Sequence, residues 1–173
     1  MIGAEGAAGL APALARQPAG WSVIVKVAGA VSVLPSDILY EVAEGSAELR
    51  AQVRGLAHDR EARAMRALAC AMSHPAAARL ATFILSMAER YGKQAFIFTQ
   101  EEVAASLNVQ RTTVTAGATD LKARRAIEYS RGRISVLDLA LLRRMACNCH
   151  QWDAAVPFAD DPRQCRRGDG PSE

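Results

Sequence analysis

The sequence has few aromatic residues and no long apolar run. Only 5% of its 173 residues are Phe, Trp or Tyr, whereas Ala is very frequent. This composition favours helices that pack closely through small side chains. No apolar run approaches the roughly 18–20 residues that span a bilayer. The first residues also lack the basic segment and apolar core of a secretory signal. We therefore expect a helical protein of the cytoplasm without a membrane partner.

The number of positively charged residues exceeds that of negatively charged residues only slightly. The chain has 21 Lys and Arg against 18 Asp and Glu, a formal net charge of +3. An excess this small does not by itself indicate a nucleic-acid partner. Half of the residues are apolar and 23% are charged. These proportions are typical of a globular chain and exclude a largely disordered one.

Cysteine is scarce, and none precedes Cys70. In a reducing cytoplasm the cysteines are expected to be thiols, with Cys70 as a small core residue. The C-x-C-H run that begins at Cys147 and includes Cys149, together with Cys165, could bind a metal, act as a redox thiol or be inert. Structural zinc usually uses two ligand pairs with wider spacing. The inert interpretation is preferred, and no metal site is predicted.

Motifs of enzymes are also missing from the sequence. It contains no nucleophile–base motif, no phosphate-binding loop and no carboxylate pair with plausible geometry. His58 falls within a predicted helix and His74 at a predicted helix start, where structural or solvated roles are expected. No catalytic residue is predicted, and the protein is not expected to be an enzyme.

The first 45 residues predict a small amount of β structure. VIVKV (23–27) and AVSVL (30–34) have strand character, with Gly29 as the turn residue. Two isolated strands are only marginally stable in water, so they are expected to be the end of a larger β structure. A short helix should follow, capped by Ser36 and ended by Gly45.

A long helix is predicted from Ser46 to about Met72. Its larger apolar residues follow one stripe, and 27 residues extend roughly 40 Å. Such a helix either packs on its own domain or pairs with its copy in a homodimer, and the second interpretation is preferred. The residues predicted for the dimer interface are Leu49, Val53, Leu56, Met65 and Leu68.

The stretch TQEEVAASLNVQRTTVTAGATDLK, which starts at Thr99, predicts two helices around a tight turn. Thr99 and Glu102 form the capping-box pattern that opens the first helix. Asn108 suits the left-handed backbone of the turn. The second helix should run over about 110–123. Its expected inward residues are Val114, Ala118 and Leu121, with Gly117 permitting a close helix approach.

Further elements flank this helix pair. A helix capped by Ser73 should end at Gly92, and AFIF (95–98) should be a short strand. AIEYSRGRISVLD predicts a β-hairpin over about 127–136, followed by a last helix capped by Asp138. Two helices followed by a hairpin define a winged helix-turn-helix, whose second helix enters the major groove of DNA.

Polar and basic side chains crowd the surface of the second helix. Arg111 can form paired hydrogen bonds with guanine, and Thr and Gln side chains can bind phosphate oxygens. From Asn108 to Arg133 the segment has six basic and two acidic residues, which gives 6 − 2 = +4. The predicted DNA-binding residues are Thr99, Gln100, Gln110, Arg111, Thr112, Thr113, Thr115, Arg131 and Arg133.

The pattern T-x-E-E-V-A-x-x-L-x-V-x-R-x-T-V-T, followed by R-G-x-I-x-V-x-D, resembles the DNA-binding domain of the Crp/Fnr family of bacterial transcription regulators. Residues 46–72 resemble the long dimer helix of that family, and residues 74–91 the first helix of its DNA-binding domain. GWSVIVKVAGAVSVLPSDIL resembles the last strands and following helix of its effector-binding β-roll, whose first part is absent. The resemblance covers about residues 2–150.

This resemblance implies a homodimer on a near-palindromic operator, with RNA polymerase as a further candidate partner. Arg111 falls on the base-reading arginine of the family, and Gln110 and Thr113, like Thr99, fall on phosphate-contact positions. Thr112 and Ala116 replace the Glu and second Arg of the cyclic-AMP-responsive members. A different operator sequence is therefore expected.

The effector residues of the family match poorly. Members that bind cyclic nucleotides use a Gly-Glu pair and an Arg-Ser pair. Here Glu5 with Gly6 and Arg16 with Gln17 are only loosely placed, and the Ser is missing. The absence of cysteine before Cys70 also gives no support for the N-terminal iron–sulfur cluster of oxygen-sensing relatives. No cofactor is predicted.

The expected fold is mainly α with a little β. Its predicted parts are a β-roll remnant (1–45), a dimerisation helix (46–72), a winged helix-turn-helix (73–146) and a disordered tail (147–173). The preferred function is sequence-specific DNA binding by a homodimeric regulator. The alternative is a dimerising fragment or winged-helix interaction module that neither senses an effector nor binds specific DNA.

Overall fold

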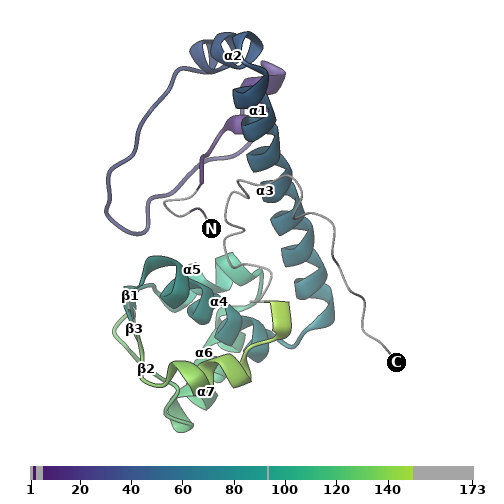
Figure 1. Cartoon of the computed structure of the whole chain (residues 1–173). Coiled ribbons are helices and arrows are strands. Elements are labelled where there is room, and N and C mark those ends of the chain that lie inside the picture. The colour runs from purple at the N-terminus through teal and green to yellow at the C-terminus, as the bar shows by residue number, and fades with distance from the viewer. Residues whose placement is uncertain (1, 3–5, 93, 150–173) are drawn as a thin grey trace.

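The computed structural model describes residues 2, 6–92 and 94–149 (Figure 1). Three helices form its first part, and a second domain contains four helices and a small sheet. None of the helices in the described ranges combines the length and apolar character that a membrane span requires. The elements in chain order are α1 (Leu10–Ala15), α2 (Ser36–Gly45), α3 (Ala47–Ser73), α4 (Ala76–Tyr91), β1 (Ala95–Ile97), α5 (Gln100–Leu107), α6 (Arg111–Ala123), β2 (Ile127–Ser130), β3 (Arg133–Val136) and α7 (Leu139–Met145).

The long helix α3 connects the two parts of the molecule. Its first half packs against α1 and α2, where Val53 is buried, and its end meets α4 (Figure 1). Ser46 caps it, because the Ser46 hydroxyl oxygen accepts a hydrogen bond of 3.2 Å from the Leu49 N–H. The predicted extent of this helix is confirmed to within one residue at each end.

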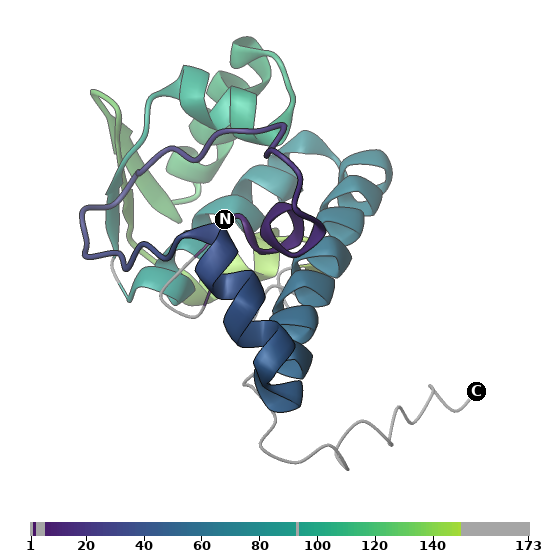
Figure 2. The ribbon, with the colours of Figure 1, turned by 90° about the horizontal axis from the view of Figure 1, so that it is seen from above.

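The predicted strands at 23–27 and 30–34 are wrong. Neither segment forms a strand, and each side chain of the apolar pair Val25 and Val33 is largely exposed, at 73% and 88%. A strand needs a partner for its backbone hydrogen bonds, and no described segment pairs with either of these. Instead, the chain between α1 and α2 forms an extended loop, which lies on the same side of the molecule as the β-sheet (Figure 2).

Two predicted helix caps are also wrong. Pro35, not Ser36, occupies the N-cap position of α2, and Gly45 is the last helical residue. Pro75 occupies the N-cap position of α4, while Ser73 ends α3. In both cases the fixed φ of proline sets the start of the helix. The predicted stop at Gly92 is confirmed, with a left-handed φ of 58°.

The second domain is built around α4 and a three-stranded antiparallel sheet in the order β1-β3-β2. In the register, Phe96 faces Ile134 across β1 and β3, and Tyr129 faces Ile134 across β2 and β3. Arg131 and Gly132 form the turn between β2 and β3 with φ of 48° and 75°. Two consecutive positive φ values match the tight turn that suits the twist of a hairpin.

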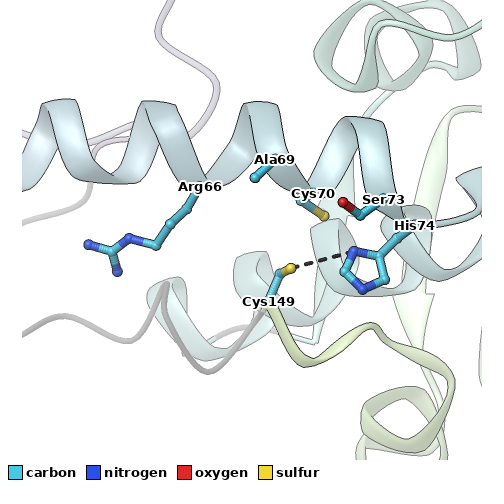
Figure 3. A pocket seen from close by; sticks show the side chains of 6 residues that line it. All are labelled: Arg66, Ala69, Cys70, Ser73, His74 and Cys149. Atoms are coloured by element: carbon cyan, nitrogen blue, oxygen red, sulfur yellow. Dashed lines mark hydrogen bonds between the residues drawn. The ribbon is translucent and has the colours of Figure 1, made fainter. Parts of the chain in front are cut away.

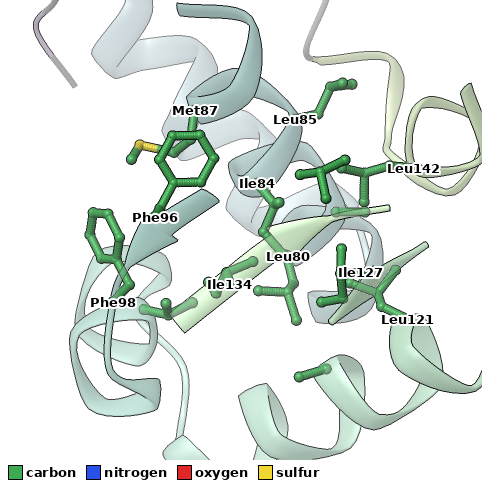
Figure 4. Packing of buried hydrophobic residues seen from close by; sticks show 14 of the residues in the cluster. Leu80, Ile84, Leu85, Met87, Phe96, Phe98, Leu121, Ile127, Ile134 and Leu142 are labelled. Atoms are coloured by element: carbon green, nitrogen blue, oxygen red, sulfur yellow. The ribbon is translucent and has the colours of Figure 1, made fainter. Parts of the chain in front are cut away.

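The core of this domain lies between α4, α6, α7 and the sheet (Figure 4). It combines aliphatic side chains from the helices with aromatic ones from β1 and the residue after the strand. The largest of the fully buried side chains are Leu80, Ile84, Leu85, Met87, Leu121, Ile127, Ile134 and Leu142. This core holds α6 against α4 and leaves the opposite face of α6 exposed.

Candidate nucleic-acid interface

The start of α5 has the predicted capping box. The Glu102 N–H donates to the Thr99 hydroxyl at 3.2 Å, and the Thr99 N–H donates to the Glu102 carboxylate at 3.0 Å. The Thr99 side chain is exposed, so an outside oxygen can reach it as well. Free N–H groups at a helix start also favour an anion such as phosphate.

The negative charge of Glu102 is balanced within the protein. Lys26, from the loop between α1 and α2, forms an ion pair with Glu102. Its hydrogen bond and the one from the Thr99 backbone N–H lower the pKa of Glu102. The ammonium group of Lys26 also lies 5.6 Å from the centre of the Phe98 ring. The carboxylate therefore presents less repulsion to a phosphate near this helix start.

The turn between α5 and α6 has the predicted left-handed residue. Asn108 has φ of 51°, and its N–H bonds to carbonyl oxygens of the last turn of α5. The Arg79 guanidinium on α4 donates to the Leu107 carbonyl, so the end of α5 is fastened to the core domain. These contacts fix where α6 begins.

Helix α6 divides into a packing face and an exposed face. Val114, Ala118 and Leu121 are buried as predicted, and so is Gly117. A Cβ at Gly117 would lie 3.0 Å from a methyl carbon of Leu80 and 3.7 Å from the Ala77 Cα. This confirms that Gly117 permits the close approach of another helix, here α4.

The exposed face of α6 carries the predicted DNA-binding residues of its first turns. Gln110 is the N-cap residue, and Arg111, Thr112, Thr113 and Thr115 are exposed. No side-chain cap from Gln110 satisfies the helix start. The first N–H groups of α6 and the side chains beside them therefore face the surface together.

One hydrogen bond joins this face to the start of α5. The Thr115 hydroxyl lies 2.8 Å from the Gln100 side-chain oxygen and 3.0 Å from the Arg111 carbonyl oxygen, and it has one proton to donate. This contact orients the Gln100 amide so that its nitrogen faces away from Thr115. Thr115 therefore holds Gln100 in this structure, a contact that the sequence did not predict.

The turn of the β2–β3 hairpin lies beside the start of α5. The Phe98 N–H donates to the Gly132 carbonyl at 2.7 Å, and a Cβ at Gly132 would be 3.8 Å from the Thr99 methyl group. Arg131 at the turn and Arg133 on β3 are both exposed. The structure thus brings the starts of α5 and α6 and the hairpin turn onto one continuous surface.

The basic charge of residues 108–133 is concentrated in a few arginines. Lys122 pairs with Glu128 at 2.8 Å, and Arg124 pairs with Asp120 at 2.9 Å. These pairs use both acidic residues of the segment. Within the described residues, the remaining basic side chains form no ion pair; they are Arg111, Arg125, Arg131 and Arg133. The segment charge of +4 therefore resides on four exposed guanidinium groups.

A second cluster, of side chains that could bind a metal, was not expected from the sequence. Cys70, His74, Cys147 and Cys149 place their sulfur and ring-nitrogen atoms within 4.8 Å of one another. Burial raises the pKa of Cys70 to about 12 and raises that of Cys149. Burial also acts to raise the pKa of Cys147, but hydrogen bonding, first from Thr82, leaves it lowered. The i, i+4 spacing of Cys70 and His74 was the available signal.

Some predicted features cannot be placed. Glu5, Cys165 and residues 150–173 of the predicted tail (147–173) lie outside the described residues. Arg16, a loose match to an effector-binding arginine, lies with its guanidinium carbon 3.9 Å from the centre of the Tyr40 ring. Its side chain is therefore engaged with α2 in this structure.

The fold and this surface define a winged helix-turn-helix domain, with α5 and α6 as the helix pair and β2–β3 as the wing. Residues 78–145 match the family model of the Crp-like helix-turn-helix domain. This match confirms the resemblance found in the sequence for that part of the chain. No curated protein matches the chain.

Solved structures with a similar fold include regulators of the Crp/Fnr family. One is a transcriptional regulator of that family from Eubacterium rectale, with 23% identity and a TM-score of 0.55 over 65% of this chain and 52% of that one. Another is a CRP-family regulator from Thermus thermophilus, with 24% identity and a TM-score of 0.52 over 58% of this chain and 55% of that one. The chain thus spans about half the length of these structures, and the likeness concerns the fold.

Proposed function

We propose that the chain is a sequence-specific transcription regulator of Crp/Fnr type that binds double-stranded DNA with α6 in the major groove. The observation that carries this proposal is the continuous exposed surface formed by the starts of α5 and α6 and by the wing. Its guanidinium groups can neutralise phosphates, and its helix starts can accept them. Action in the cytoplasm and contact with RNA polymerase belong to the same proposal.

Different groups of residues on this surface have different proposed roles. Arg111 reads a base, because it is exposed at the start of α6 and a guanidinium can donate two hydrogen bonds to guanine. Arg131 and Arg133 bind phosphates beside the wing. Contacts to phosphate or sugar are proposed for the polar residues Thr99, Gln100, Gln110, Thr112, Thr113 and Thr115.

Selection from random DNA sequences tests specific binding. We expect a near-palindromic motif to be enriched by the full chain. A selection that enriches no motif would instead favour the alternative function, an interaction module or fragment without specific DNA binding.

The Arg111→Ala variant then tests base reading. On the selected site, we expect a loss of about 1–3 kcal/mol, or about 5- to 140-fold in Kd, and relaxed preference at one base pair of each half-site. Arg125→Ala is the matched control, since Arg125 is also exposed but follows the other end of α6. Equal losses by Arg111→Ala on selected and random DNA would contradict base reading.

We also propose that the chain is a homodimer that pairs through the second half of α3. Met65 and Leu68 are 64% and 57% exposed, and Met72 is 81% exposed. Their spacing places them on one helical stripe. Val53 is buried within the protomer and Leu49 and Leu56 are half-buried, so these three predicted interface residues have less surface to offer. A second α3 would cover the exposed stripe.

Sedimentation of a Met65→Glu, Leu68→Glu double variant tests this interface. We expect a monomer, because two carboxylates would have to be desolvated at each copy of the stripe. Ala67→Glu is the control: Ala67 is exposed on the same helix but lies away from the stripe. A dimer that survives the double substitution would place the interface elsewhere.

A further inference from the structure

Two pairs of side chains that can bind metals, Cys70 with His74 and Cys147 with Cys149, lie together where the end of α3 approaches the segment after α7. The Cys70 and Cys147 sulfur atoms are 3.6 Å apart, and the Cys149 sulfur is 3.6 Å from Nδ1 of His74. Figure 3 shows Cys149 and His74 facing each other below the last turns of α3, with Cys70 beside them. All four candidate ligand atoms lie within 4.8 Å of one another.

Local structure explains why each pair converges. Cys70 and His74 are four residues apart, and His74 caps α3 with its N–H bonded to the Cys70 carbonyl at 3.1 Å. Both side chains therefore project from one face of the helix end. After α7, the Cys147 N–H donates to the Thr82 hydroxyl on α4 at 3.0 Å. This bond fixes Cys147 on α4, where its sulfur lies 3.6 Å from that of Cys70 near the end of α3.

We propose that Cys70, His74, Cys147 and Cys149 bind one structural zinc ion. Three thiolates and one imidazole are a common ligand set for tetrahedral zinc. Two Zn–S bonds of about 2.3 Å at a tetrahedral angle place their sulfur atoms about 3.8 Å apart. The observed separation of 3.6 Å between Cys70 and Cys147 matches that distance closely. The site needs only a small closure of the longest separations.

The surroundings fit a closed site for a single ion. Cys147 is buried and the other three ligands are half-buried. With one ligand atom from each residue, the protein supplies all four coordination positions of a tetrahedral ion. Such a complete set is typical of structural zinc, whereas catalytic zinc keeps a position for water. Ligand atoms this close together leave no room for the bridging sulfides of an iron–sulfur cluster.

Thr82 would support zinc binding indirectly, through a hydrogen bond to the ligand Cys147. Its hydroxyl oxygen lies 3.0 Å from the Cys147 sulfur and can donate a hydrogen bond to a thiolate there. Such partners orient metal ligands and stabilise their charged form. The zinc would then hold the end of α3, the start of α4 and the segment after α7 together, independently of any DNA contact.

Metal analysis of the full chain, purified under reducing conditions, tests the proposal. We expect about one zinc ion per chain and at least a tenfold loss of zinc in a Cys70→Ser, Cys149→Ser double variant. Matched controls are Cys165→Ser and His58→Ala, which leave the four ligands intact and should keep the ion. Zinc below a tenth of an equivalent in the wild-type chain, even after zinc is supplied, would overturn the proposal. Loss of zinc in the controls as well as in the double variant would do the same.

Cobalt titration of the wild-type chain provides a readout that does not depend on a variant folding. Co²⁺ in this site should give the intense visible bands of a tetrahedral ion together with thiolate charge-transfer absorption, and zinc should displace them. Weak octahedral bands would overturn the proposal. So would iron with acid-labile sulfide in the purified chain, or a Cys70–Cys147 disulfide that persists in the reduced preparation.

Discussion

Gly117→Ala tests how tightly α6 is seated on α4. Replacing Gly by Ala inside a helix stabilises it by about 1 kcal/mol. Here the new methyl would lie 3.0 Å from a methyl carbon of Leu80, whose side chain is 1% exposed. Adding a methyl to a packed core costs about 1–3 kcal/mol. The packing cost minus the gain in helix propensity predicts that Gly117→Ala lowers the free energy of unfolding by about 0–2 kcal/mol.

Two companion variants separate the opposing terms. Ala116 is exposed beside Gly117, so Ala116→Gly should cost about 1 kcal/mol and calibrate helix propensity at this point. In a Leu80→Ala background the obstructing methyl is gone. Gly117→Ala should then stabilise the chain by about 1 kcal/mol, and the difference between backgrounds measures the coupling.

Urea unfolding followed by helical circular dichroism provides these free energies. A stabilisation of about 1 kcal/mol by Gly117→Ala in the wild-type chain would refute the reasoning. It would mean that Leu80 moves aside at no cost and that the glycine is not required by packing. An equal effect in both backgrounds would show that Leu80 is not the obstacle.

Two further predictions concern the segment around the wing. Thr99→Ala should lower the free energy of unfolding by about 1 kcal/mol through loss of the cap of α5, whereas Thr99→Ser should retain most of it. Burial first, and the charge of Glu102 second, raise the pKa of Tyr129 above its usual 10.0, and its hydroxyl donates to the Phe98 carbonyl at 2.8 Å. The unfolded chain therefore releases this proton first, so stability should fall as pH rises above about 10. Urea titrations across that range should show a shallower fall in Tyr129→Phe, and identical slopes would contradict the assignment.

The winged helix-turn-helix could be predicted from the sequence because its signals are local. The capping box at Thr99, the left-handed turn at Asn108 and the Arg131–Gly132 turn each determine a few neighbouring residues, and the structure has all three. The strands expected at 23–27 and 30–34 depend on partners far away in the chain. Their alternating apolar residues are necessary for a strand but do not supply a neighbouring strand.

The proposed DNA-binding surface depends on local sequence, whereas the cysteine cluster depends on contacts between distant parts of the chain. The exposed residues of α6 followed from helical spacing around Val114, Ala118 and Leu121, which are buried as expected. The meeting of Cys70 and Cys147 depends on how the chain returns to α3 after α7. Sequence spacing contains no information about that return. Only the packing of α7 on α4 brings the two ligand pairs together.

The division of α6 into two faces has a consequence for how such a protein can change over time. The residues that seat the helix include Gly117 and Leu121, whereas those proposed to meet DNA, such as Arg111 and Thr112, contribute nothing to the core. Substitutions on the outer face can therefore accumulate with little effect on folding. A duplicated gene could acquire a new target sequence through a few exposed positions while the same buried residues keep the helix in place.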